Sequence, residues 1–150
     1  MLTKDGPKVL EYNCRFGDPE TQVVIPRLKS DLLEILISTI ECRISNIVLE
    51  WDPRPAVCIV LAAGGYPGSY EKGIPIEGLD KAREEDDVIV FHAGTDVKDD
   101  KIVTSGGRVL GVVGLGDDIK GAIDRAYTAV ELIHFKDMHY RKDIGKRALK

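Results

Sequence analysis

The hydrophobic and polar positions of the first twenty residues predict a β-hairpin that ends in an abrupt turn. Two extended segments, Leu2–Thr3 and Val9–Cys14, flank Lys4–Pro7, which contains an Asp-Gly pair. An Asp-Gly pair between extended residues favours a tight hairpin turn. The second segment is followed by Gly17, where the extended conformation is expected to stop.

Two helices are predicted after this turn. Asp18–Pro19 supplies an N-cap and a first helical residue, and the helix through Thr21–Ile25 should end or bend at Pro26. Asp31, with Glu34 three positions later, forms a capping-box pattern ahead of a second helix. Its predicted apolar face consists of Leu32, Leu33, Leu36, Ile37 and Ile40.

The rest of the chain is predicted to be rich in strands and to contain one long helix. Apolar runs and turn residues predict strands at Ala56–Ala63, Val88–His92, Asp96–Val97, Lys101–Val103 and Arg108–Val113. The first of these is a continuous apolar run and should be buried on both faces. Asp117 or Asp118 caps a helix with apolar residues at helical spacing, namely Ile119, Ala122, Ile123, Ala126, Val130 and Ile133.

Composition narrows the class of protein. The chain has 150 residues, 43% apolar and 31% charged, which is typical of a globular domain. A mixed net charge of −4 argues against nonspecific nucleic-acid binding, and no apolar run reaches the ~18 residues of a membrane helix. The scattered Cys14, Cys42 and Cys58 predict reduced thiols in a cytoplasmic protein, and His92, His134 and His139 form no ligand cluster in the sequence.

The predicted strand at the start of the chain carries three polar residues two positions apart. Alternation places Glu11, Asn13 and Arg15 on one face. Carboxylate and amide oxygens suit Mg²⁺, which completes its shell with water and nucleotide phosphates, and a guanidinium can bind phosphate bidentately. The pattern therefore fits half of a metal–triphosphate site. An ordinary solvent-facing strand with surface ion pairs fits the same spacing.

A longer stretch resembles a known enzyme family. The string VLEYNCRFGDPETQVVIPRLKSDL is similar to the signature of phosphoribosylamine–glycine ligases, which belong to the ATP-grasp superfamily. The resemblance continues, in the family's order, through LAAGGYPGSYEKG, VFHAGT, VTSGGRVLGVVGLG and YRKDIG. It implies an α+β fold, with the end of an ATP-grasp domain at about residues 1–47. A small, mixed, β-rich C-terminal domain with one packed helix would follow at about residues 48–150.

The same resemblance implies an activity and roles for the three polar residues. The family joins glycine to 5-phosphoribosylamine in purine biosynthesis, using ATP and passing through glycyl phosphate. By motif match, Glu11 and Asn13 become ligands of Mg²⁺ or Mn²⁺. Arg15 becomes the catalytic residue that stabilises the transferring phosphoryl group, a role that suits phosphoryl transfer.

Two further groups of residues are candidate substrate contacts. Gly17, Asp18 and Glu20 occupy the loop that faces the acceptor substrate in related enzymes, although Asp18 also fits a simple helix cap. Gly107 and Arg108 close a Ser-Gly-Gly turn, which suggests a phosphate cradle for the ribose phosphate. A hairpin turn with a surface arginine explains the same residues.

The resemblance also implies what this chain lacks. The family's polypeptides are longer and carry N-terminal domains with the glycine-rich ATP loop and the adenine pocket. We therefore expect the isolated chain to be inactive as a ligase and to need those domains as partners. The main alternative is a noncatalytic binding or assembly module derived from an ATP-grasp enzyme, and another ATP-grasp ligase or carboxylase is disfavoured by RFGDPETQ.

Overall fold

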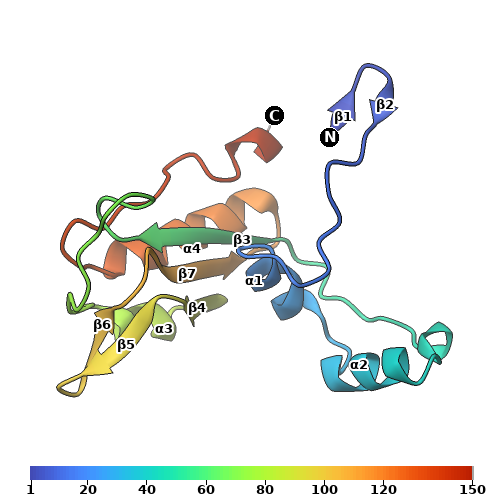
Figure 1. Ribbon diagram of the computed structural model, residues 1–150, viewed down its shortest axis with the longest axis horizontal. Coiled ribbons are helices and arrows are strands. Elements are labelled where there is room, and N and C mark those ends of the chain that lie inside the picture. Colours follow the sequence, from blue (N-terminus) through green and yellow to red (C-terminus); the bar gives the residue numbers. More distant parts are fainter. Residues whose placement is uncertain (150) are drawn as a thin grey trace.

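A computed structural model describes residues 1–149 of the chain. A three-stranded antiparallel sheet in the order β3-β7-β4 forms the centre of the molecule (Figure 1). Its strands are β3 (Ala56–Ala62), β7 (Arg108–Leu115) and β4 (Val88–His92). Two small sheets pair β1 (Leu2–Thr3) with β2 (Gly6–Pro7), and β5 (Thr95–Lys98) with β6 (Lys101–Thr104). The helices are α1 (Thr21–Val24), α2 (Leu32–Ile40), α3 (Leu79–Glu84) and α4 (Ile119–Leu132), with short 3-10 turns η1 (Ile25–Arg27), η2 (Ile44–Asn46) and η3 (Lys146–Leu149). The predicted α+β class is confirmed.

The hydrophobic core lies between the sheet and α4, with α3 at its edge. Val57, Ile59 and Leu61 point into this core from β3 and are buried, whereas the residues between them are half-buried. Ile59 is opposite Val112 of β7, which is also fully buried. The predicted strand is therefore confirmed, but only its face toward α4 is fully buried. Its other face packs against α1, a helix of four residues, and β3 lies at the edge of the sheet.

Helix α4 packs close to β7 because β7 carries a glycine, Gly114, where they meet. A Cβ at Gly114 would lie 2.6 Å from the backbone O of Ala122 and 2.6 Å from the backbone N of Ala126. The helix begins as predicted, since the side chain of Asp118 accepts a 2.7 Å hydrogen bond from the N–H of Gly121. This cap satisfies one of the free N–H groups at the helix start.

Helix α1 lies on the opposite face of the sheet from α4. On this face Gln22 of α1 lies beside Gly111 of β7, 3.7 Å from where a Cβ would stand, which is an ordinary van der Waals distance. Helix α1, and with it the turn that precedes it, therefore packs against the sheet. Among residues 1–149, no helix is both long enough and apolar enough to span a bilayer.

The N-terminal hairpin differs from the prediction. β1 pairs with Gly6–Pro7, and Val9–Cys14 runs on without strand pairing. An extended segment becomes a strand only when a neighbour pairs with its N–H and C=O groups, and none of residues 1–149 does so here. Leu10 and Tyr12 are 72% and 84% exposed as a result.

The predictions for the first two helices are partly confirmed. Asp18–Pro19 does not cap α1, because the turn at 18–20 precedes the helix and the Asp18 carboxylate accepts a hydrogen bond from the Gln22 side chain instead. Pro26 falls in η1, where the α-helix ends. Asp31 caps α2 through the N–H groups of Leu33 and Glu34. The predicted apolar face of α2 is largely uncovered, and the helix extends away from the sheet (Figure 1).

The sequence prediction missed α3. Only Leu79 and Ala82 of this short helix are buried, and a run of charged residues from 80 to 87 surrounds them. Two apolar residues give too little periodicity for a helix to be recognised. The predicted hairpin at 95–104 is confirmed, and Asp99 and Asp100 at its turn both have positive φ, as a tight hairpin requires.

Candidate functional site

The turn before α1 is joined to the central sheet by an ion pair. The Arg108 guanidinium, at the start of β7, lies 3.1 Å from the Asp18 carboxylate and donates a 3.1 Å hydrogen bond to the Asp18 carbonyl. These residues are 90 positions apart in sequence. The structure therefore brings together two residues that the sequence analysis had assigned to separate substrate contacts.

The polar residues of the preceding segment remain together although the segment is not a strand. The side-chain amide of Asn13 donates to the Glu11 carboxylate at 3.3 Å, so these two side chains share one side of the chain. The Arg15 guanidinium instead donates to the carbonyl of Phe16 at 2.9 Å. All three side chains are exposed. Alternation thus holds for Glu11 and Asn13, and the bend at 14–15 turns Arg15 toward the following residue.

The oxygens of Glu11 and Asn13 fit part of a magnesium shell. They are hard ligands from adjacent side chains, and Mg²⁺ in nucleotide sites commonly takes one or two protein ligands. No cluster of three or more His, Cys, Asp or Glu side chains suited to a metal occurs between residues 1 and 149. Any metal here would therefore depend on ligands outside these two side chains.

The Ser-Gly-Gly turn before Arg108 has little free hydrogen-bonding capacity. The N–H groups of Ser105 and Gly106 both donate to the carbonyl of Gly94, at 2.7 and 3.1 Å. A Cβ at Gly107 would collide with the ring of Tyr66, so that ring covers the glycine. The turn packs against its neighbours, and its N–H groups at 105 and 106 are not available to a phosphate.

Two hollows flank the turn at residues 17–20. One, of about 340 Å³, is lined by Phe16, Gly17, Asp18, Thr21, Gln22, Ile25, Phe91 and His92. The other, of about 270 Å³, is lined by Pro19, Glu20, Val23, Ala56, Val57, Cys58, Ile144 and Gly145. Asp18 and Glu20 therefore face different sides of the turn. Gln22, which lines the first hollow, has a buried side-chain oxygen with no hydrogen-bond partner among the described residues.

His92 enters the site through the structure, since the sequence alone gave it no partner. Its Nε2 lies 2.5 Å from the Arg83 guanidinium and its Nδ1 lies 2.9 Å from the Thr95 hydroxyl. Burial lowers the pKa of His92, and the positive charge of Arg83 lowers it further. The imidazole is therefore held neutral near pH 7, accepting from Arg83.

Cys58, on the α1 face of β3, is expected to react with iodoacetamide more slowly than the exposed Cys14 and Cys42. Burial raises the pKa of Cys58 to about 11, and the charge of Asp18 adds to this. Because the thiolate is the reactive form, labelling at about pH 8 followed by mass spectrometry should show Cys58 modified last. Equal rates at the three thiols would contradict this burial. The folded chain also holds the Cys58 proton more tightly than the unfolded chain does. The free energy of unfolding should therefore fall as the pH rises from the ordinary thiol pKa of ~8.5 to about 11.

A second charged cluster joins the segment at 52–54, which precedes β3, to the sheet. Arg54 contacts Asp52 at 2.9 Å and Asp87 at 2.7 Å, and Arg125 of α4 lies 3.5 Å from Asp87. The hydrogen bond from Arg54 lowers the pKa of Asp52 to about 2. The Arg27 guanidinium donates to the Asp52 carbonyl at 3.3 Å, which ties η1 to the same segment. The segment at 52–54 is therefore anchored on both sides.

Comparison with known proteins identifies related sequences for both parts of the chain. The family described as phosphoribosylglycinamide synthetase, C domain, matches residues 56–147, and the ATP-grasp (A) domain of the same synthetase matches residues 1–21. The phosphoribosylamine–glycine ligase of Caldanaerobacter subterraneus is 56% identical over 145 residues, covering 97% of this chain and 34% of that protein. The trifunctional purine biosynthetic protein adenosine-3 of Gallus gallus is 53% identical over 150 residues, covering 99% of this chain and 15% of that protein.

A solved structure shares the fold. The crystal structure of phosphoribosylamine–glycine ligase from Thermotoga maritima superposes with a TM-score of 0.73 at 37% identity, covering 95% of this chain and 34% of that one. The ligase of Synechocystis is 56% identical over 151 residues, covering 99% of this chain and 36% of that protein. The chain thus spans about a third of the length of the single-function ligases that it matches.

Proposed function

Because this chain belongs to the phosphoribosylglycinamide synthetase family, we propose that it supplies one side of the active site of a ligase that joins glycine to 5-phosphoribosylamine with ATP. The observation that carries this proposal is the placement of the turn at 17–20. This turn follows the Glu11–Arg15 segment directly and is fixed to the sheet by the Asp18–Arg108 ion pair. The nucleotide side and the acceptor side of a reaction would meet at such a junction.

Glu11 and Asn13 would hold Mg²⁺ or Mn²⁺ on the nucleotide side, where the metal would neutralise phosphate charge. Their side-chain oxygens are adjacent and exposed, as such a role requires. Arg15 is the proposed catalytic residue. Its guanidinium now binds a neighbouring carbonyl in an exposed position, so rotation of the side chain would free it for a phosphoryl group.

The turn at 17–20 would face the acceptor substrates. We assign substrate contacts to Gly17, Asp18 and Glu20, with Asp18 best placed to hold an ammonium group or an attacking amine. Arg108 holds the Asp18 carboxylate in position through their ion pair, and Gly107, the residue before it, packs against the ring of Tyr66. The Arg108 guanidinium has five N–H groups, so those not bonded to Asp18 would remain for a ribose phosphate.

The proposed reaction has two steps. A carboxylate oxygen of glycine attacks the γ-phosphorus of ATP, and the bond from that phosphorus to the β,γ-bridging oxygen breaks, giving glycyl phosphate and ADP. The amine of phosphoribosylamine then attacks the glycyl carbonyl carbon, phosphate leaves and the amine loses a proton. Arg15 would stabilise the charge on the transferring phosphoryl group in the first step and on the leaving phosphate in the second.

The remainder of an ATP-grasp domain is the proposed partner, in the cytoplasm. We place the boundary between that domain and the C-terminal domain near residue 47. The apolar surface that this partner would cover is exposed in the chain: Val9, Leu10, Tyr12, Phe16, Leu33 and Ile40 are each at least 57% exposed. Exposed apolar surface of this extent commonly marks an interaction site.

A chimera tests the proposed function. The part of the Caldanaerobacter ligase that precedes its match would be joined to this chain, and ADP release would be followed with glycine, phosphoribosylamine and Mg-ATP. We expect ADP release from the chimera that needs both glycine and the amine, and none from the 150-residue chain alone. A folded chimera without this activity would contradict the proposal, as would full activity of the isolated chain.

A further inference from the structure

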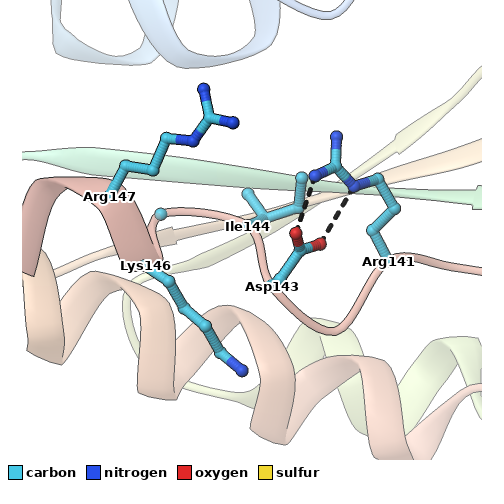
Figure 2. A pocket seen from close by; sticks show the side chains of 6 residues that line it. Arg141, Asp143, Ile144, Lys146 and Arg147 are labelled. Carbon is cyan, nitrogen blue, oxygen red and sulfur yellow. Dashed lines mark hydrogen bonds and ion pairs between the residues drawn. The ribbon is translucent and has the colours of Figure 1, made fainter.

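A basic loop near the end of the chain forms a cavity outside the site described above (Figure 2). Residues 141–149 contain Arg141, Lys142, Lys146 and Arg147 but only one carboxylate, Asp143, in a chain whose net charge is −4. The cavity has a volume of about 490 Å³ and is lined by Arg141, Asp143, Ile144, Gly145, Lys146 and Arg147. A concentration of positive charge around a cavity in an acidic protein points to an anionic ligand.

This loop is anchored to α4. The hydroxyl of Tyr127 donates to the carbonyl of Arg141 at 2.7 Å and accepts from the N–H of Ile144 at 3.2 Å. Gly145 has φ +79, and a Cβ there would lie 2.6 Å from the Cδ1 of Ile123. A glycine therefore lets the loop approach the helix closely. The backbone that carries the cationic side chains is therefore held in place, which reduces the conformational entropy lost when a ligand binds.

Two of the cations around the cavity have no carboxylate partner in the part of the chain that the structure describes. Arg141 forms two hydrogen bonds with Asp143, at 2.9 and 2.8 Å, which balance its charge. Neither Lys146 nor Arg147 forms an ion pair within residues 1–149. In Figure 2 the Arg147 and Arg141 side chains point to the same side of the loop, whereas Lys146 points to the opposite side. Arg147 therefore combines an unpaired charge with a position on the same side as the other arginine of the lining.

The cavity adjoins the turn at 17–20. Ile144 and Gly145 line it and also line the hollow that contains Pro19 and Glu20. An anion at Arg147 would therefore lie next to the proposed acceptor side. The other candidate for anion binding in this region, Arg108, is engaged by Asp18.

We propose that this cavity binds the phosphate group of a sugar phosphate, with Arg147 as its main contact and Lys146 adding positive charge. A guanidinium matches phosphate oxygens bidentately. The described residues that line the cavity include no aromatic side chain, so they offer no stacking surface for a nucleotide base. Identification of the sugar phosphate as the amine substrate rests on the function proposed above, whereas phosphate binding itself does not.

Titration of the ¹⁵N-labelled chain with ribose 5-phosphate, followed by NMR, tests this proposal. We expect the amide signals of Gly145, Lys146 and Arg147 to shift with ribose 5-phosphate and not with ribose. Arg147→Ala should weaken binding by about tenfold, the loss typical of one charge-assisted contact. Arg43→Ala is the matched control, because it removes an exposed arginine from the α2 region.

The outcomes separate the possible sources of binding. Equal affinity of the Arg147→Ala and unchanged chains would overturn the proposal, as would shifts confined to residues around Arg108. Tighter binding of ATP than of ribose 5-phosphate at the same amides would reject a sugar phosphate as the ligand. The Arg147 side chain is exposed and the Arg43 side chain is 40% exposed, so the amide spectra of the variants should otherwise be preserved. The assay needs no ligase activity, so its result is independent of the chimera experiment.

Discussion

Replacing Arg15 by alanine is expected to lower the turnover number of the active chimera by roughly a hundred- to a thousandfold, the loss found when one preorganised donor to a developing anion is removed. The KM for glycine should change little, because the guanidinium is proposed to act on the phosphoryl group as it transfers. The Arg15 side chain is exposed, and within residues 1–149 its guanidinium donates to the neighbouring carbonyl of Phe16, so its removal should leave the fold intact. Initial rates of ADP release measure both constants.

The control for this change is Arg43→Ala, in an exposed arginine that pairs with Glu34 and Glu41. This variant should retain turnover, because Arg43 lies in the α2 region, away from the turn at 17–20. A melting temperature within the range of the unchanged protein would show that both variants fold. Turnover of Arg15→Ala equal to that of Arg43→Ala would remove Arg15 from the reaction.

Elements whose signals are local could be predicted from the sequence. The cap at Asp118, the cap at Asp31 and the Asp99–Asp100 turn each depend on residues within a few positions, and the structure contains all three. The expected strand at 9–14 failed because a strand needs a distant partner, which local alternation cannot supply. The Asp18–Pro19 cap failed because the helix begins only at Thr21, and Asp18 is used in contacts with Gln22 and with Arg108, 90 residues away.

In the candidate site, too, the arrangements that depend on nearby residues could be predicted, whereas those that depend on distant contacts could not. Adjacency of Glu11 and Asn13 follows from their spacing, and it is present even without the strand. The pairing of Asp18 with Arg108 and the contacts of His92 depend on how the turn is seated on the sheet. That seating brings Gln22 of α1 beside Gly111 of β7. Local sequence patterns show each of these residues but not the contact between two distant segments.

Replacing Gly114 by alanine is expected to lower the free energy of unfolding of this chain by about 3 kcal/mol, the upper end of the usual range for overpacking a core. The new Cβ would lie 2.6 Å from two backbone atoms of α4, at Ala122 and Ala126. Backbone atoms in a helix cannot turn aside as a flexible side chain can, so α4 must move away from β7. That movement would open a close contact of the core, where Ala122 and Ala126 are both fully buried.

Gly73→Ala is the matched control for this change. Gly73 has φ +78 and open space around its Cβ position, so only the conformational penalty of a left-handed residue, roughly 1–2 kcal/mol, should appear. Urea unfolding of both variants, followed by circular dichroism, gives the two free energies. A Gly114→Ala chain that loses no more stability than the Gly73→Ala chain would show that α4 can shift on β7 at little cost. In that case the close contact between α4 and β7 would not be needed to hold the central sheet, which carries Arg108, in place.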